Sequence, residues 1–131
     1  MSGSSPTARA IAEMRRLGWM AQVVERWNPH ARVRQDLFGI IDVLAVDERY
    51  TYGIQVTSGS NHAARRTKMS LSTKALVWLR SPHRRLEIWS YSKRKIKRGG
   101  VAFKYELRRE RMTVESLATD PGAPQGVESE G

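Results

Sequence analysis

The 131-residue chain contains no cysteine, which excludes disulfide bridges and thiolate metal sites and fits a reducing compartment. It has no run approaching the roughly 20 apolar residues of a transmembrane helix. Its first residues, MSGSSPTAR, lack the apolar segment of a secretory signal. These absences predict a cytoplasmic protein that does not associate with a membrane.

Acidic residues are scarce. The chain has 13 Asp and Glu against 23 Lys and Arg, a formal net charge of +10. Residues 113–131 hold four of the acids and none of the basic residues, so residues 1–112 carry nine acids against 23 basic residues, a net charge of +14. Such a basic domain attracts polyanions, usually nucleic acid. We predict one nucleic-acid-binding domain over 1–112 and an acidic, disordered tail over 113–131.

Apolar patterning predicts a helix that is capped by Thr7 and stopped by Gly18. A second helix is expected to begin near His62 with Asn61 as its cap, and to continue, or restart after residues 70–72, until residues 81–82. The expected strands are 19–27, 40–46, 51–56, 85–91 and 101–108. The order of helix, three strands, helix and strand, with one further strand, predicts an α/β (α+β) fold with a mixed sheet flanked by helices.

Two short runs rich in Val and Ile, 40–46 and 51–56, flank a charged turn at residues 47–49, a pattern typical of a β-hairpin. If the turn is centred between residues 48 and 49, Asp42 lies directly opposite Gln55. Opposite residues of an antiparallel pair share a face, with Cβ atoms about 5 Å apart. The hairpin would therefore place an acid and an amide side by side.

Thr57 follows Gln55 by two positions and projects from the same face. A half-buried carboxylate at Asp42 needs a partner. One candidate is a divalent cation, and the other is an arginine such as Arg34.

An acid in the second strand, followed by a short polar signature ending the third, resembles the PD-(D/E)xK nuclease superfamily. The nearest likeness is to its small Holliday junction resolvase-like and phage-encoded endonucleases. Asp42 matches the family Asp, Gln55-Val56-Thr57 occupies the (D/E)-x-K place, and the resemblance covers roughly residues 8–91. It implies a restriction-endonuclease-like αβββαβ core and an Mg²⁺- (or Mn²⁺-) dependent endonuclease acting on duplex or branched DNA. By analogy it also implies a homodimer in a bacterial or phage-infected cell.

In this resemblance, Asp42, Gln55 and the Val56 carbonyl would bind the metal. Gln55 stands where the family has an acid, and Thr57 stands where it has a lysine. Thr57 would orient the attacking water, or Lys68 on the following helix would do so as a displaced substitute.

A further acid is expected from the first helix of this family, where Glu13 is the candidate. Glu25 and Asp36 are the alternatives.

Phosphate contacts are expected at the start of the second helix, where backbone amides are free, along that helix, and in a basic loop at 93–100. The four tryptophans are interpreted as core or core-edge residues, and no histidine has the spacing of a metal ligand. The candidate nucleic-acid-binding residues are Ser58, Asn61, Arg65, Arg66, Lys93, Arg94, Lys95, Lys97 and Arg98.

Two other functions are compatible with the sequence. One is a catalytically weakened relative that binds DNA structurally, because Gln55 and Thr57 replace the usual acid and lysine. The other is a basic RNA-binding protein without an active site.

Overall fold

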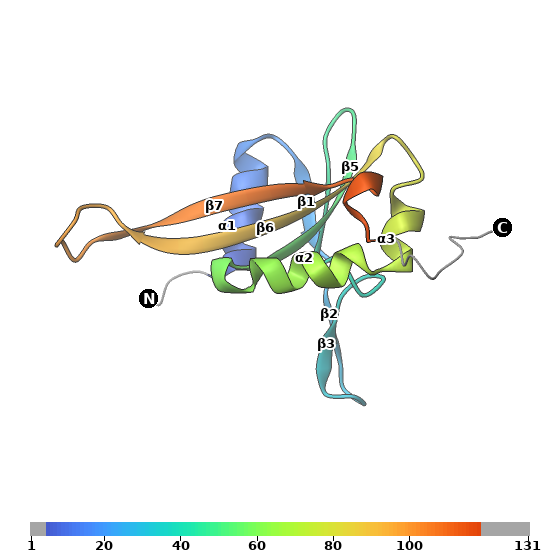
Figure 1. Ribbon diagram of the computed structural model, residues 1–131, viewed down its shortest axis with the longest axis horizontal. Coiled ribbons are helices and arrows are strands. Elements are labelled where there is room, and N and C mark those ends of the chain that lie inside the picture. The colour runs from blue at the N-terminus through green and yellow to red at the C-terminus, as the bar shows by residue number, and fades with distance from the viewer. Residues whose placement is uncertain (1–4, 119–131) are drawn as a thin grey trace.

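The computed structural model describes residues 5–118. Its centre is a five-stranded sheet of order β1-β4-β5-β6-β7, in which β5 and β6 are parallel and the other neighbours antiparallel. The sheet strands are β1 (Met20–Val23), β4 (Val43–Val46), β5 (Thr51–Ser58), β6 (Arg84–Lys95) and β7 (Phe103–Met112). The helices are α1 (Pro6–Arg16), α2 (His62–Ser70) and α3 (Thr73–Trp78), with 3₁₀ turns η1 (Gly59–Asn61) and η2 (Val114–Ser116). The predicted mixed sheet flanked by helices is confirmed (Figure 1).

Strand alternation divides the core into two layers, one on each face of the sheet. Helix α1 covers one face, where Met14 packs with Ile54 and Trp89. Helices α2 and α3 cover the other face, where Met69 packs with Ile88. Residues 86, 88 and 90 share one face of β6, because Ser90 hydrogen-bonds α2 on the side of Leu86 and Ile88.

The first helix begins earlier than predicted. Ser5, not Thr7, is the cap: its Oγ accepts a hydrogen bond from the Ala8 N–H at 3.1 Å. Pro6 then occupies the first helical position, where its missing N–H costs nothing. Gly18 ends the helix as predicted, with a φ of +85° that favours glycine.

The predicted strand over 19–27 is wrong, because it breaks in two. Strand β1 ends at Val23, and β2 (Arg26–Asn28) instead pairs with β3 (Val33–Gln35), a segment in which no strand was expected. Together they form a two-stranded ribbon that projects from the body of the protein (Figure 1). Trp27 lies on this ribbon with 56% of its surface exposed, so it is not a core-edge residue.

Strands β6 and β7 form a second projection, a long antiparallel hairpin (Figure 1). Both strands are longer than expected. The residues at 93–95, predicted to open a loop, belong to β6, and the connection covers only residues 96–102. Lys93, Arg94 and Lys95 therefore lie on a regular strand, and Lys97 and Arg98 lie in the connection.

Helix α2 starts at His62 as expected, although the Asn61 side chain does not cap it. The η1 turn precedes it, and the Asn61 amide donates to Ser58 Oγ at 3.3 Å instead. His62 is buried, with Nδ1 2.6 Å from Ser90 Oγ and Nε2 2.8 Å from Glu110 Oε1. These bonds tie α2 to strands β6 and β7.

The chain leaves β7 through η2 and stays against the body, where the Ala118 N–H donates to the Ser70 carbonyl at 2.9 Å. The rest of the predicted acidic tail, 119–131, lies outside the described residues. In the described part, no helix has the length and apolar character to cross a bilayer.

Candidate metal-binding site

The β4–β5 hairpin has the predicted register. Val43 pairs with Ile54 and Val46 with Thr51, so the next position places Asp42 opposite Gln55. The Gln55 Nε2 donates to Asp42 Oδ1 at 2.9 Å. The predicted meeting of this acid and this amide on one face of the sheet is therefore confirmed. Both side chains are buried, Asp42 at 6% exposure and Gln55 at 1%.

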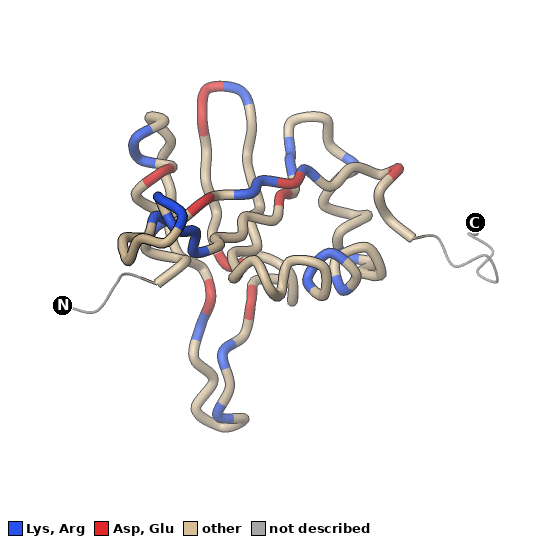
Figure 2. The backbone as a smooth tube through the Cα atoms, turned by 60° about the vertical axis from the view of Figure 1, so that its left-hand side comes forward, with Lys and Arg blue, Asp and Glu red and all other residues tan. Residues whose placement is uncertain are grey.

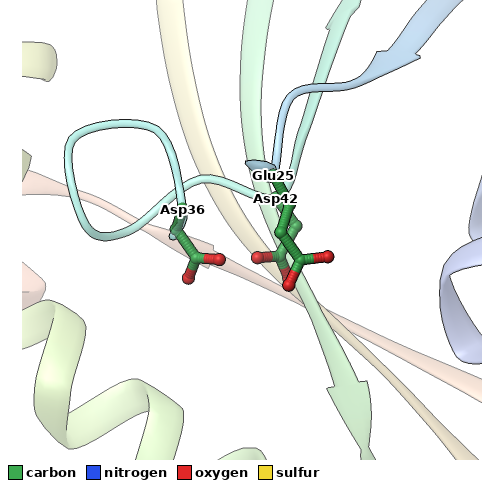
Figure 3. Close-up of side chains that lie close together, drawn as sticks. All are labelled: Glu25, Asp36 and Asp42. Atoms are coloured by element: carbon green, nitrogen blue, oxygen red, sulfur yellow. The ribbon is translucent and has the colours of Figure 1, made fainter. Parts of the chain in front are cut away.

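Two further carboxylates complete the group. Oxygen atoms of Glu25, Asp36 and Asp42 all lie within 4.8 Å of one another (Figure 3). Glu25 directly precedes β2 and Asp36 directly follows β3. Because Arg26 pairs with Gln35, the same register sets Glu25 opposite Asp36 at the base of the ribbon. The group is thus assembled from the two strands at the base of the ribbon and from the residue that precedes β4.

Glu13 is not part of this group. It lies on α1, which packs on the opposite face of the sheet from Gln55, and it pairs with Arg16 at 2.6 Å. Of the further acids considered from the sequence, Glu25 and Asp36 are the two that lie beside Asp42. The proposed alternative pairing of Asp42 with Arg34 is not formed either, since Arg34 Nη1 lies 3.9 Å from Glu25 Oε1.

Gln55 is turned so that its amide nitrogen faces the acids. The Nε2 donates to Asp36 Oδ2 as well as to Asp42, both at 2.9 Å, while Oε1 accepts from Arg65 Nη1 at 3.4 Å. The expected role of the Gln55 oxygen as a metal ligand would therefore require the amide to rotate by half a turn.

The Val56 backbone borders the same group. Its N–H donates to Asp42 Oδ2 at 2.8 Å. In an extended strand the N–H and C=O of one residue point to the same edge. The Val56 carbonyl therefore faces the edge on which Asp42 lies, where the resemblance expects a metal ligand.

Two of the carboxyls have opposite titration shifts. Burial and the hydrogen bond with Asp36 raise the pKa of Asp42 to about 8. Burial also acts to raise the pKa of Asp36, but hydrogen bonds with Asp42 and Gln55, and the charges of Lys68 and Arg65, leave it lowered. At neutral pH the metal-free pair therefore holds one proton, because both carboxyls cannot ionise at this distance without a cation.

The group borders an open cavity of about 690 Å³ that is otherwise basic. Glu25 and Asp36 line it, and four cationic side chains surround them: Arg34, Arg65, Lys68 and Lys74. Three carboxylate oxygens suit a hard divalent cation such as Mg²⁺ or Mn²⁺, with waters completing the coordination. The donor set fits such a metal, and the surrounding cations fit a phosphate beside it.

The other predicted residues are distributed over several places. Lys68 lines the cavity, but Thr57 is buried with 6% exposure and is not among its lining residues. Arg66 points elsewhere, with Nε 2.7 Å from Glu110 Oε2. Ser58 borders a separate cavity with Arg9 and Lys93 at the other end of α2. Five predicted contacts are exposed along the β6–β7 hairpin: Lys93, Arg94, Lys95, Lys97 and Arg98.

Sequence reasoning missed Arg34 and Lys74 as cavity residues. Arg34 reaches the cavity only because the ribbon exists, and the sole sequence signal for that ribbon was the Asn28-Pro29 turn pair. Lys74 is the second residue of α3, so its position depends on the break between α2 and α3.

Comparison with known proteins finds no family model that matches the chain, and no curated protein or solved structure that is significantly similar to it. Its function is therefore argued from the geometry of this site.

Proposed function

We propose that the protein is a metal-dependent DNA endonuclease of the PD-(D/E)xK type. The observation that supports this best is the convergence of Glu25, Asp36 and Asp42 within 4.8 Å of one another, at the edge of a cavity lined by Arg and Lys side chains. A surface built only to attract a polyanion would not place three acids at its centre, because they weaken the attraction.

The residues around the cavity would have different roles in this reaction. Glu25, Asp36 and Asp42 would hold the metal, which when bound supplies charge stabilisation at the phosphate and a water of lowered pKa. Arg65 and Arg34 would bind the non-bridging phosphate oxygens. Lys68 replaces Thr57 as the residue that orients the attacking water, because Lys68 lines the cavity and Thr57 is buried beside it in the sheet.

The two projections extend the basic surface away from the cavity. Figure 2 shows Lys and Arg along both the β2–β3 ribbon and the β6–β7 hairpin. Contacts from these arms to phosphates would set affinity and orientation rather than sequence preference. Two basic arms that project in different directions suit a branched DNA as well as a duplex (Figure 1).

A second candidate, a nuclease-like protein that binds DNA without cutting it, is favoured by the orientation of Gln55. Its amide nitrogen donates to two of the three acids. The neutral amide thereby supplies hydrogen bonds to two carboxyl groups that would otherwise need a cation as their partner.

A cleavage assay separates the two functions. Purified protein is incubated with supercoiled, linear, single-stranded and four-way-junction DNA in Mg²⁺, Mn²⁺ or EDTA. Cutting in the presence of metal and none in EDTA is the expected result. Tight, salt-sensitive binding with no cutting in any metal would support the second candidate, and a preference for RNA without metal dependence would contradict both.

The β6–β7 hairpin gives a separate prediction. Changing Lys95, Lys97 and Arg98 together to Gln is expected to weaken binding to all DNA sequences alike. It should also reduce the slope of log K against log salt by about 0.9 for each phosphate that the hairpin no longer neutralises. Fluorescence anisotropy at a series of salt concentrations measures both.

The matched control neutralises three exposed arginines outside the arms, Arg15, Arg49 and Arg80. It removes the same charge, so an equal reduction of the slope in the control would show that the hairpin makes no specific phosphate contacts.

A further inference from the structure

A second cavity, of about 430 Å³ and largely apolar, adjoins the acidic one. The two cavities share Phe38 and Lys74 in their linings. The remaining lining residues come from α3 and the start of β6: Val77, Trp78 and Arg84. The apolar cavity therefore meets the acidic cavity at Phe38 and Lys74.

Phe38 has an unfavourable backbone conformation. Its φ is +55°, a left-handed conformation that is rare for a bulky residue, and 52% of its surface is exposed. The turn that carries it is closed by the hydrogen bond from the Ile40 N–H to the Leu37 carbonyl at 3.1 Å. A strained backbone that exposes an aromatic ring is typical of a ligand site rather than of a core.

The side of the cavity opposite Phe38 is formed by Trp78 and Arg84, which hydrogen bonds hold in place. Trp78 Nε1 donates to the Arg85 carbonyl at 2.9 Å, and Arg84 Nε donates to the Trp78 carbonyl at 2.7 Å. The rings of Phe38 and Trp78 have centroids 6.5 Å apart and are inclined by 52°. They form a corner rather than a slot, so a flat ligand would stack on one exposed ring face with its edge toward the other ring.

The chemistry of this corner fits a nucleobase. Two aromatic rings and Val77 offer flat apolar contact, and Lys74 and Arg84 add positive charge at the margin, which suits a ligand attached to a phosphodiester chain. Lys74 faces both cavities. One nucleotide could therefore place its phosphate beside the acids and its base, or its neighbour's, against Phe38.

We propose that this apolar cavity binds an unpaired nucleobase next to the phosphate held at the acidic cavity. A base inside a duplex cannot enter a side cavity without leaving the stack. The substrate class is therefore DNA with an unpaired nucleotide at the cutting position, such as a bulge, a flap or a branch point. This rests on the proposed function, because it takes the acidic cavity as the place where the phosphate binds.

The test measures binding in Ca²⁺ in place of Mg²⁺, using three DNAs that differ at one position. They are a fully paired duplex, the same duplex with one unpaired nucleotide, and the latter with an abasic residue at that nucleotide. The expected result is about tenfold tighter binding of the unpaired nucleotide than of the duplex, as one base–aromatic stack provides. The abasic DNA should bind like the duplex. Equal binding of the abasic and intact unpaired DNAs would overturn the proposal.

Two variants at Phe38 test whether this cavity causes the preference. Phe38→Leu is expected to lose the tenfold preference, and Phe38→Tyr, which keeps the aromatic face, should retain it. The control is Leu71→Ala, an exposed apolar residue outside the cavity, which should not change the preference. A preference that survives in Phe38→Leu would assign the base to another site.

A parallel cleavage assay in Mg²⁺ keeps the two proposals apart. A base preference without any cutting leaves the cavity assigned and removes the nuclease. Cutting of paired and unpaired DNA at equal rates, with no difference in binding, retains the nuclease and removes the base site.

Discussion

Asp42→Asn is expected to abolish metal-dependent DNA cleavage, with a loss of roughly a thousandfold or more, equivalent to about 4 kcal/mol of barrier. The asparagine keeps the shape of the side chain. The Val56 N–H and Gln55 Nε2 bond different oxygens of Asp42, at 2.8 and 2.9 Å, and the single asparagine oxygen can replace only one of them. The substitution also removes the charge that the metal requires. Affinity for DNA in EDTA should remain.

The control for this variant is Glu48→Gln, in the exposed turn of the same hairpin. It removes one negative charge at the far end of β4 from Asp42 and should cut at the wild-type rate. Cleavage by Asp42→Asn at the wild-type rate would show that the three acids are not the metal site.

The same Asp42→Asn substitution should stabilise the metal-free protein at alkaline pH. The carboxyl has an ordinary pKa of 3.8, and burial with the Asp36 hydrogen bond raises the pKa to about 8 in the folded state. Between these values the unfolded chain has lost the proton that the folded chain keeps. Folding stability therefore falls as pH rises, by up to about 1.4 kcal/mol per pH unit.

Urea unfolding in EDTA at a series of pH values between these two pKa values measures this slope, which should be reduced in the variant. An unchanged slope would assign it to other groups.

Gln55→Glu is expected to have the second largest effect. It should lower the thermal stability of the metal-free protein, and bound metal should restore that stability. Gln55 is 1% exposed and donates to Asp36 and Asp42 at 2.9 Å. A glutamate there replaces two donated hydrogen bonds by a fourth carboxylate in contact with two others. Leaving buried charges unpaired costs on the order of 3–5 kcal/mol. The metal-free variant should therefore unfold at a much lower temperature.

Mg²⁺ or Mn²⁺ should reverse this loss, because added charge in the ligand set raises affinity for a hard cation. Thermal unfolding across a metal titration provides the measurement, since a ligand stabilises in proportion to the logarithm of its concentration over Kd. Gln55→Leu is the matched control, because it removes the same donor without adding charge and should gain no affinity for metal. Destabilisation of Gln55→Glu that metal does not relieve would favour the non-cutting candidate.

The sequence allowed the β4–β5 hairpin and its register to be predicted. The charged residues at 47–49 fix where the chain reverses, and a fixed turn fixes every pair along the strands. That argument placed Asp42 opposite Gln55, as the structure does.

The remaining two acids could not be placed in this way. Residues 19–27 contain two Trp and two Val, which favour strands, and no Gly or Pro, so the local sequence gives no reason for β1 to stop at Val23. The reason is tertiary: after the Val24 N–H donates to the Asp42 carbonyl at 2.8 Å, the chain turns away from the sheet and pairs with a later segment. Only that pairing reveals that Glu25 and Asp36 meet, and that Trp27 is exposed.

The placement of Glu25 and Asp36 opposite each other at the base of one ribbon has a mechanical consequence. Asp42 belongs to the central sheet, so a tilt of the ribbon would change the distance of the other two carboxylates from it. If DNA engages Arg26 or Arg32 on the ribbon, DNA and metal must bind with coupled energies. By thermodynamic reciprocity, each would then change the affinity for the other by the same factor.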